Sequence, residues 1–249
     1  MRHVLNLTRA QLYLDLNADF DPDKKIQLDE WITRRLNGEP LAYIIKSREF
    51  YGLEFFVDSR VLIPRPETEL LVETAVRFCQ EHSAGLLADI GCGSGAIAVS
   101  LAVVLPGVKI FATDLSVEAL EVARLNARTH RVAQQITFLQ GDLLEPLKSP
   151  VDVLIANLPY VAKRDWLDMA TAPFEPKLAL EAGEYGLDSI FRLITQLKGK
   201  VNPGGCALLE IGQGQAMAVT DCMNEFFSGY RIDVYKDLAG IERVVRLIL

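Results

Sequence analysis

The 249-residue sequence contains little cysteine, little histidine and no long hydrophobic run. Its four cysteines are scattered without a CxxC pair, which is typical of reduced thiols in a cytoplasmic protein and not of a disulfide framework. The three histidines lie away from every motif described below, so neither a metal site nor a histidine base is expected. No hydrophobic stretch approaches the roughly 18 residues of a membrane-spanning helix. Polar residues interrupt the amino terminus, which excludes a signal peptide.

Positive charge is also scarce. The chain has 26 Lys and Arg residues against 33 Asp and Glu residues, which gives a net charge of −7. Proteins whose main partner is a phosphate backbone need clustered Lys and Arg, so direct nucleic-acid binding is not expected. Hydrophobic residues make up 50% of the chain, enough for a substantial core. This length accommodates one medium-sized domain together with a small one.

Residues 1–46 are predicted to form a small helical domain. Leu12 and Leu16 follow helical spacing, Asp21 suits the start of a second helix, and Asn37 suits its end. This segment is too short for an independent core, so it must pack on something else. It is either a partner-binding domain or a helical extension without a binding role.

Residues 47–66 are predicted to form a β-hairpin that links this domain to the rest of the chain. Two short strands are expected within residues 48–63, around Gly52. Two prolines then stiffen the chain, with Arg65 and Glu67 beside them. Arg65, Glu67 and Thr68 are candidates for positioning a substrate.

Residues 67–249 alternate between predicted helices and strands, which indicates an α/β domain with a mostly parallel sheet. Residues 162–186 are expected to form a loop and residues 202–205 a turn. The connection between the last two strands is too short for a crossover. These strands should therefore pair with each other in antiparallel fashion. The seven predicted strands span residues 86–90, 109–113, 136–140, 151–156, 206–211, 230–237 and 241–249. The predicted helices span residues 68–81, 96–105, 116–128 and 187–198, with a last one ending near 227.

A glycine-rich turn follows the first of these strands, which ends with Asp89 and Ile90. The turn consists of Gly91, Cys92, Gly93, Ser94 and Gly95. Its glycines permit positive φ and let a ligand approach the backbone. By itself the turn suits nicotinamide dinucleotide enzymes, methyltransferases and simple tight turns. The absence of a third glycine at Rossmann spacing and the closing antiparallel strands favour a nucleoside without pyrophosphate, such as S-adenosylmethionine (AdoMet).

Further cofactor-binding residues are expected at the ends of the next two strands. Asp114 ends the second strand, where a carboxylate can accept both hydroxyls of a ribose, and Leu115 follows it. Asp142 would accept the adenine amino group, and Leu143 would cover the face of the adenine ring.

Asn157, Leu158, Pro159 and Tyr160 follow the fourth strand, at the sheet edge where ligands bind in α/β proteins. The Asn157 side chain and the Leu158 carbonyl offer two acceptors for the hydrogens of a planar NH₂ group. The proline holds Leu158 extended, and Tyr160 can stack on a flat amide or base. The same four residues also suit a strand-ending turn. Glu210, at the end of the fifth strand, either supports the site or is a simple strand-end carboxylate.

The combination of motifs resembles the protein-(glutamine-N5) methyltransferases that modify peptide-chain release factors, the PrmC/HemK family. The resemblance covers residues from about 4 to 249. It is carried by residues 38–43, 49–69, 89–95 and 155–161, together with Glu175, Pro176, Leu180 and residues 242–244.

This resemblance implies a class I AdoMet-dependent methyltransferase with a Rossmann-like sheet of seven strands. Asn157 and the Leu158 carbonyl would hold the glutamine amide of a Gly-Gly-Gln motif, and Asn157 would also border the cofactor. Residue 158 is usually proline in the family, and members usually carry one or two more helices before His3. Asn-Leu-Pro-Tyr also resembles ribosomal-RNA adenine dimethyltransferases, so an amino-methyltransferase acting on adenine in DNA or RNA is the alternative.

Overall fold

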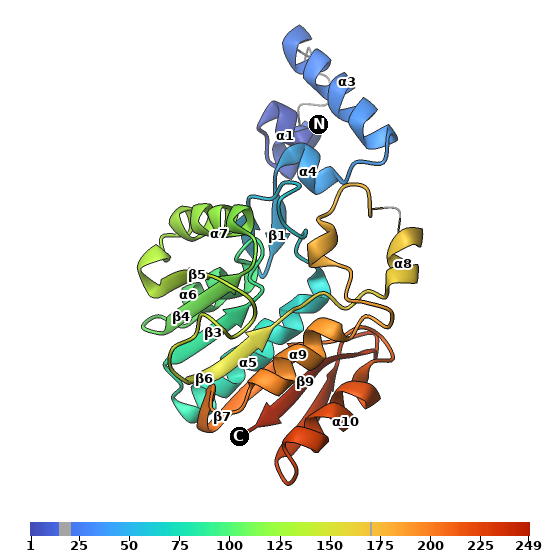
Figure 1. Ribbon diagram of the computed structural model, residues 1–249. Helices are drawn as coiled ribbons and strands as arrows, with labels where there is room; N and C mark the ends of the chain where they lie inside the picture. The colour runs from blue at the N-terminus through green and yellow to red at the C-terminus, as the bar shows by residue number, and fades with distance from the viewer. Residues whose placement is uncertain (15–20, 170) are drawn as a thin grey trace.

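The computed structural model describes residues 1–14, 21–169 and 171–249. The first described part is helical, as predicted, although Leu16 lies outside the described residues. Asp21 caps a helix by accepting a hydrogen bond from the N–H of Asp23. These helices stand apart from the sheet, above one of its edges (Figure 1). They are α1 (Arg2–Leu5), α2 (Arg9–Leu14), α3 (Pro22–Leu36) and α4 (Leu41–Ile45).

A β-hairpin follows, shorter than predicted. Its strands are β1 (Arg48–Phe50) and β2 (Leu53–Phe55), which pair in antiparallel fashion. The two short strands predicted around Gly52 are confirmed, and the second ends at Phe55 because a side chain makes the backbone hydrogen bonds that a strand partner would make. The side chain of Asn126 both accepts from the N–H of Phe56 and donates to its carbonyl, at 2.8 and 3.0 Å.

The sheet of the main domain has seven strands in the order β5-β4-β3-β6-β7-β9-β8. Pairing is parallel from β5 to β7, while β9 is antiparallel to both β7 and β8. The predicted antiparallel pair of final strands is therefore confirmed, and β9 inserts between β7 and β8. The strands are β3 (Leu86–Ile90), β4 (Lys109–Asp114), β5 (Ile136–Gln140), β6 (Val151–Ala156), β7 (Val201–Glu210), β8 (Arg231–Lys236) and β9 (Glu242–Ile248).

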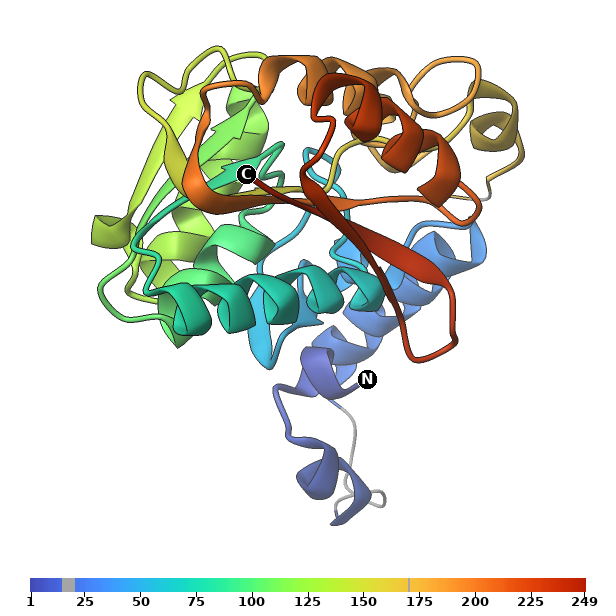
Figure 2. The same cartoon turned by 90° about the horizontal axis from the view of Figure 1, so that it is seen from below.

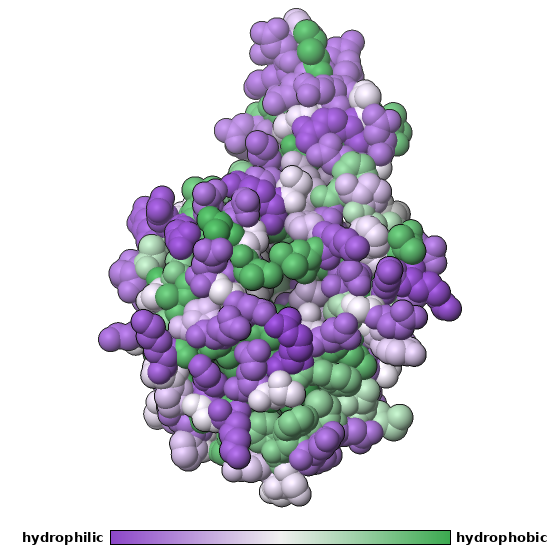
Figure 3. Space-filling view, in the orientation of Figure 1, coloured by the Kyte–Doolittle hydropathy of each residue, from purple (hydrophilic) through white to green (hydrophobic). Residues whose placement is uncertain are grey.

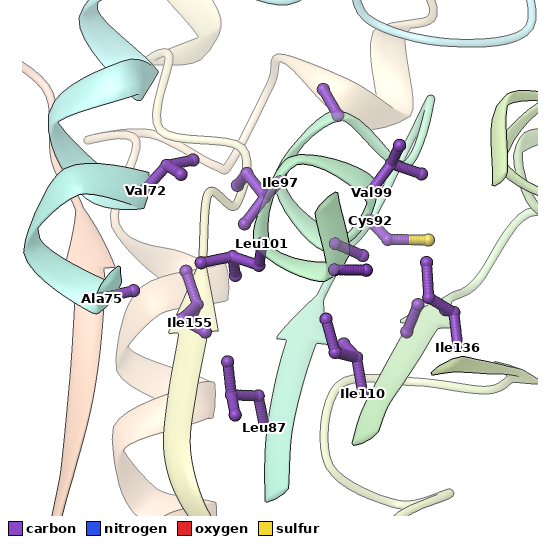
Figure 4. Packing of buried hydrophobic residues seen from close by; sticks show 14 of the residues in the cluster. Val72, Ala75, Leu87, Cys92, Ile97, Val99, Leu101, Ile110, Ile136 and Ile155 are labelled. Carbon is purple, nitrogen blue, oxygen red and sulfur yellow. The ribbon is translucent and has the colours of Figure 1, made fainter. Parts of the chain in front are cut away.

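Helices cover both faces of this sheet, in three layers (Figure 2). The helices are α5 (Glu69–His82), α6 (Ala96–Val104), α7 (Val117–Thr129), α9 (Asp188–Gln196) and α10 (Ala216–Phe226). Leu87 and Ile155 join the core cluster under α5 and α6, shown in Figure 4. Their neighbours Ala88 and Leu154 join the cluster on the other face. This alternation is the period of two that a strand imposes on its side chains.

Two segments differ from the sequence-based expectation. The predicted turn at residues 202–205 lies inside β7, because Val201 already pairs with Val151 and the register then shifts. Gly205 permits this irregularity, since a Cβ there would overlap the carbonyl oxygen of Asp152. The predicted loop at 162–186 contains the helix α8 (Lys163–Asp168), a 3-10 turn (Lys177–Ala179) and a bridge that joins Val161 to Glu181.

Within the described ranges, no helix is both long enough and apolar enough to cross a membrane. Those ranges also hold no group of three or more His, Cys, Asp or Glu residues that could bind a metal ion.

Candidate active site

A cavity of about 220 Å³ opens at the carboxyl ends of the central parallel strands. In Figure 3 the surface is hollowed between the N-terminal helices and the sheet domain, with hydrophobic side chains beside the hollow. Nine residues predicted from the sequence line the cavity. They are Gly91, Gly93, Asp114, Leu115, Asp142, Leu143, Asn157, Leu158 and Pro159.

The glycine turn between β3 and α6 forms one wall. The N–H groups of Gly91 and Cys92 both donate to the Thr113 carbonyl at 2.9 Å, which ties the turn to β4. Gly93 has a φ of 52°, and a Cβ built on it would meet no atom within 4 Å. Because Gly93 also lines the cavity, a side chain there would project into the space that a ligand needs.

Asp114 braces this turn and faces the cavity. Its two carboxylate oxygens accept hydrogen bonds from the N–H of Gly93 at 2.8 Å and of Ser116 at 2.9 Å. Burial raises the pKa of Asp114, and these backbone hydrogen bonds oppose the rise. Each oxygen keeps a further lone pair, so the carboxylate can still accept from two neighbouring hydroxyl groups.

Asp142 lines the cavity, and its carboxylate already has a charged partner. Its carboxylate forms an ion pair with Arg192 of α9, which also lines the cavity. Leu143 has a φ of 47°, and its carbonyl accepts a hydrogen bond from the Thr113 hydroxyl at 3.2 Å. An adenine amino group would therefore share Asp142 with Arg192, a partner that sequence reasoning did not find.

Asn157 lies at the end of β6 with its amide held in one orientation. Its Nδ2 donates to Thr68 Oγ1 at 2.9 Å, which leaves Oδ1 as an acceptor on a residue that lines the cavity. Leu158 beside it is 5% exposed and packs in the core. A Cβ on Gly91 would lie 3.0 Å from Leu158 Cδ2, so this side chain packs closely on the glycine turn.

Tyr160 follows Pro159 and is partly buried. Its hydroxyl donates to Glu210 Oε1 at 3.3 Å, and burial raises its pKa. Glu210 is 1% exposed. Burial raises the pKa of Glu210 to about 7, against the hydroxyls of Thr68 and Tyr160 and the charge of Arg243. Tyr160 does not line the cavity, and its stacking on a flat amide or base stays a prediction.

Four other expected cofactor residues do not line the cavity: Asp89, Cys92, Ser94 and Gly95. Asp89 is fully buried, with one oxygen bonded to the N–H of Ala98 and the other without a partner among the described residues. Burial raises the pKa of Asp89 to about 7, and the nearby charge of Asp114 adds to the rise.

The three candidate substrate-positioning residues have different surroundings. Arg65 forms an ion pair with Glu175 at 2.6 Å, and Glu175 also accepts from the N–H of Ile63. This pair fixes residues 63–65 to the segment that supplies Pro176, Leu178 and Ala179 to the cavity. Thr68 holds Asn157, whereas Glu67 is exposed.

Several residues that line the cavity were not predicted as site residues from the sequence. Arg60, Val61 and Leu62 come from the linker after the hairpin, and Ser189 comes from α9. Both segments lie far from the glycine turn along the chain, so only the folded chain brings them to the cavity. Residues 49–69 and Glu175 both carry the family resemblance, but only the structure shows that Arg65 and Ile63 bind Glu175.

Two family models match the chain: "Methyltransferase small domain" over residues 66–175 and "PrmC N-terminal domain" over residues 1–45. The release factor glutamine methyltransferase of Bordetella pertussis is 41% identical over 249 residues, 97% of this chain and 90% of that protein. The protein of the same name from Koribacter versatilis is 39% identical over 245 residues, covering 97% of this chain and 86% of the relative.

Solved structures share the fold at low identity. A methyltransferase from Pyrococcus furiosus has a TM-score of 0.58 and 17% identity, covering 88% of this chain and 98% of that one. The catalytic domain of hMettl16, bound to an RNA hairpin, has a TM-score of 0.62 and 15% identity, covering 92% and 82%. At such identities the likeness concerns the fold alone.

Proposed function

Because the chain belongs to the family of release factor glutamine methyltransferases, we propose that Asn157 and the Leu158 carbonyl hold the substrate glutamine amide. The chain is an AdoMet-dependent enzyme, and its substrate is a release factor. The methyl group goes to the side-chain amide nitrogen of a glutamine, which we place in a Gly-Gly-Gln motif. The adenine-methylating alternative gains no support from these relatives.

The cavity has the features that AdoMet requires. Gly93 leaves open space where any other residue would place a Cβ. Asp114 has acceptor capacity left for ribose hydroxyls, and Asp142 and Leu143 lie at the end that would take adenine. When bound, AdoMet supplies an electrophilic methyl group on a sulfonium centre.

The orientation of the Asn157 amide is the observation that supports the proposed binding of the glutamine amide. An amide nitrogen is a poor nucleophile, because its lone pair is delocalised into the carbonyl. Asn157 Oδ1 is free to accept one N–H, since Nδ2 is committed to Thr68. With the Leu158 carbonyl accepting the other N–H, the nitrogen is fixed in place and its lone pair is aimed at the methyl group.

Most of the acceleration then comes from orientation and from placed dipoles. The nitrogen becomes strongly acidic once it carries a positive charge, so its proton leaves without a strong general base. The products are N5-methylglutamine, S-adenosylhomocysteine and one proton.

We also propose that residues 1–46 form the part that binds the release factor, with residues 47–66 as linker and 67–249 as catalytic domain. The helix α3 has no buried residue. Ile26 and Leu36 on it are 69% and 81% exposed, which offers apolar surface to a partner. The helix stands on the side of the sheet where the cavity opens (Figure 1).

The direct test follows transfer of tritiated methyl groups from AdoMet. A release factor, its Gln-to-Ala version at the Gly-Gly-Gln motif, and DNA and RNA are assayed in parallel. We expect label only in the unmodified release factor. Label in the Gln-to-Ala version, or in nucleic acid alone, would contradict the proposed reaction.

Replacing Leu158 by proline separates the backbone role of this residue from its packing. Because the proposed acceptor is the carbonyl, which proline keeps, turnover should stay within about tenfold of the parent. The free energy of unfolding should fall by roughly 1–2 kcal/mol, because the buried side chain is lost from the core. Urea unfolding and the methylation assay measure the two effects.

Leu158→Ala is the matched control, since it removes the same packing without stiffening the chain. A folded Leu158→Pro enzyme that lost activity more than a hundredfold would show that the N–H or side chain of Leu158 acts on the substrate.

A further inference from the structure

A line of polar side chains runs from Asn157 into the core, behind the cavity. Asn157 Nδ2 donates to Thr68 Oγ1 at 2.9 Å, and Thr68 is 4% exposed. The carboxylate of Glu210 accepts the Tyr160 hydroxyl on Oε1, and the nearby Thr68 hydroxyl lowers the pKa of this carboxyl group. Its other oxygen, Oε2, is buried and accepts no hydrogen bond from any described residue. Neither Thr68 nor Glu210 lines the cavity, so neither touches a ligand there.

Resting on the proposed function, we propose that Glu210 acts through Thr68 to keep the Asn157 amide oxygen, and not its nitrogen, turned towards the substrate. Thr68 and Glu210 are thus positioning residues for the grip on the glutamine amide.

The orientation of the Asn157 amide depends on the single hydrogen of the Thr68 hydroxyl. An ionised carboxylate can only accept hydrogen bonds, so Glu210 Oε2 requires a donor. The Thr68 hydroxyl is close enough to lower the pKa of Glu210. Among the described residues, this hydroxyl accepts from Asn157 and donates no other hydrogen bond. With that hydrogen directed to Glu210, Thr68 Oγ1 can only accept from Asn157. The NH₂ group of Asn157 must then face Thr68, as the structure has it.

Without an ionised Glu210, the donor and acceptor roles of Thr68 and Asn157 can be exchanged. Thr68 would donate to Asn157 Oδ1, and the Asn157 NH₂ group would turn towards the substrate. It would then oppose the NH₂ group of the glutamine, with donor facing donor and no hydrogen bond formed. Asn157 alone cannot prevent this, because the two ends of an amide have nearly the same shape.

The surroundings of Glu210 place its ionisation, and with it the change in orientation of the Asn157 amide, near neutral pH. Burial raises the pKa of Glu210 to about 7, and Glu67 before α5 adds to the rise. Thr68, Tyr160 and Arg243 of β9 act in the opposite direction. Protonated Glu210 can itself donate to Thr68, which favours the exchanged donor and acceptor roles. Turnover should therefore rise with pH through about 7, as Glu210 ionises.

Three variants test the proposal: Thr68→Val, Thr68→Ser and Glu210→Gln. Valine matches threonine in shape but cannot hydrogen-bond, so we expect turnover to fall by about tenfold, the effect of losing about one hydrogen bond. Serine keeps the hydroxyl and should stay within about threefold of the parent. The Kd for AdoMet should change by less than about threefold in all three, because none of these side chains lines the cavity.

The pH profile of turnover at saturating AdoMet supplies the readout that a merely structural role would not move. The parent and Thr68→Ser should gain activity between pH 6 and 8 with the slope of one proton. Glu210→Gln and Thr68→Val should both lose that rise, because each breaks the link between a titrating carboxylate and Asn157. Asp89 has a raised pKa in the same range, but it is unchanged in every variant and so cannot cause the difference.

A Thr68→Val enzyme with parental turnover, or with the parental pH profile, would overturn the proposal. If Glu210→Gln does not fold, the comparison of Thr68→Val with Thr68→Ser still decides. A parent that fails to methylate a release factor would overturn the proposed function itself. A parent that methylates it, alongside an equally active Thr68→Val, would overturn only the inference about positioning.

Discussion

Replacing Asn157 by alanine is expected to lower the turnover of a release factor by about 100-fold or more, the usual effect of losing one preorganised polar group. Alanine removes the Oδ1 acceptor and, with it, one of the two contacts that would orient the glutamine nitrogen. The binding of AdoMet should remain within about threefold of the parent, because the glycine turn and Asp114 are unchanged. Turnover is measured by methyl transfer and AdoMet affinity by calorimetry.

Asn224→Ala is the matched control, since it makes the same change at an exposed position on α10. Its turnover should equal that of the parent. If a folded Asn157→Ala protein methylates the release factor at the parental rate, Asn157 does not hold the amide. The comparison with Thr68→Val adds a second check, because removing Asn157 itself should cost more than releasing its orientation.

Asp114→Ala should weaken AdoMet binding by roughly 1–3 kcal/mol, the cost of leaving polar groups without a charged acceptor. Two effects act in the same direction. The ribose hydroxyls lose their acceptor, and the N–H groups of Gly93 and Ser116 lose the carboxylate that braces them. Calorimetry with AdoMet measures the loss, and thermal unfolding shows whether the protein remains folded.

The control for Asp114 is Asp221→Ala, which removes the same charge from an exposed position on α10. It corrects for the change in net charge and should leave the affinity unchanged. An unaltered AdoMet affinity in a folded Asp114→Ala protein would remove Asp114 from the cofactor site.

Much of the sheet domain could be predicted because its signals are local. Apolar runs of five or six residues predicted β3, β5 and β6 with the bounds that the structure has. The glycine turn and the polar residues after β4 and β6 follow their strands directly. Since carboxyl ends of parallel strands meet at one edge, their sequence order alone brought Gly93, Asp114 and Asn157 to one cavity.

Other features depend on contacts that leave no local pattern. Residues 202–205 have the composition of a turn, yet they lie in β7 because Val201 pairs with Val151. The second strand of the hairpin ends at Phe55 because the side chain of Asn126, 70 positions from Phe56, makes the backbone hydrogen bond there. Neither partner, Val151 or Asn126, can be identified from the local composition.

By itself, the sequence determined the α/β class, the edge of the sheet that carries the site, and the chemistry of the residues at that edge. These follow from periodicity and from which residue types end each strand. Only the tertiary structure decided how the Asn157 amide is turned, since Thr68 lies 89 positions from it along the chain. It also decided that Arg192 pairs with Asp142 and that Glu210 is buried. The physical reason is that the orientation of a polar group depends on its hydrogen-bond partners, and here those partners are brought together by folding.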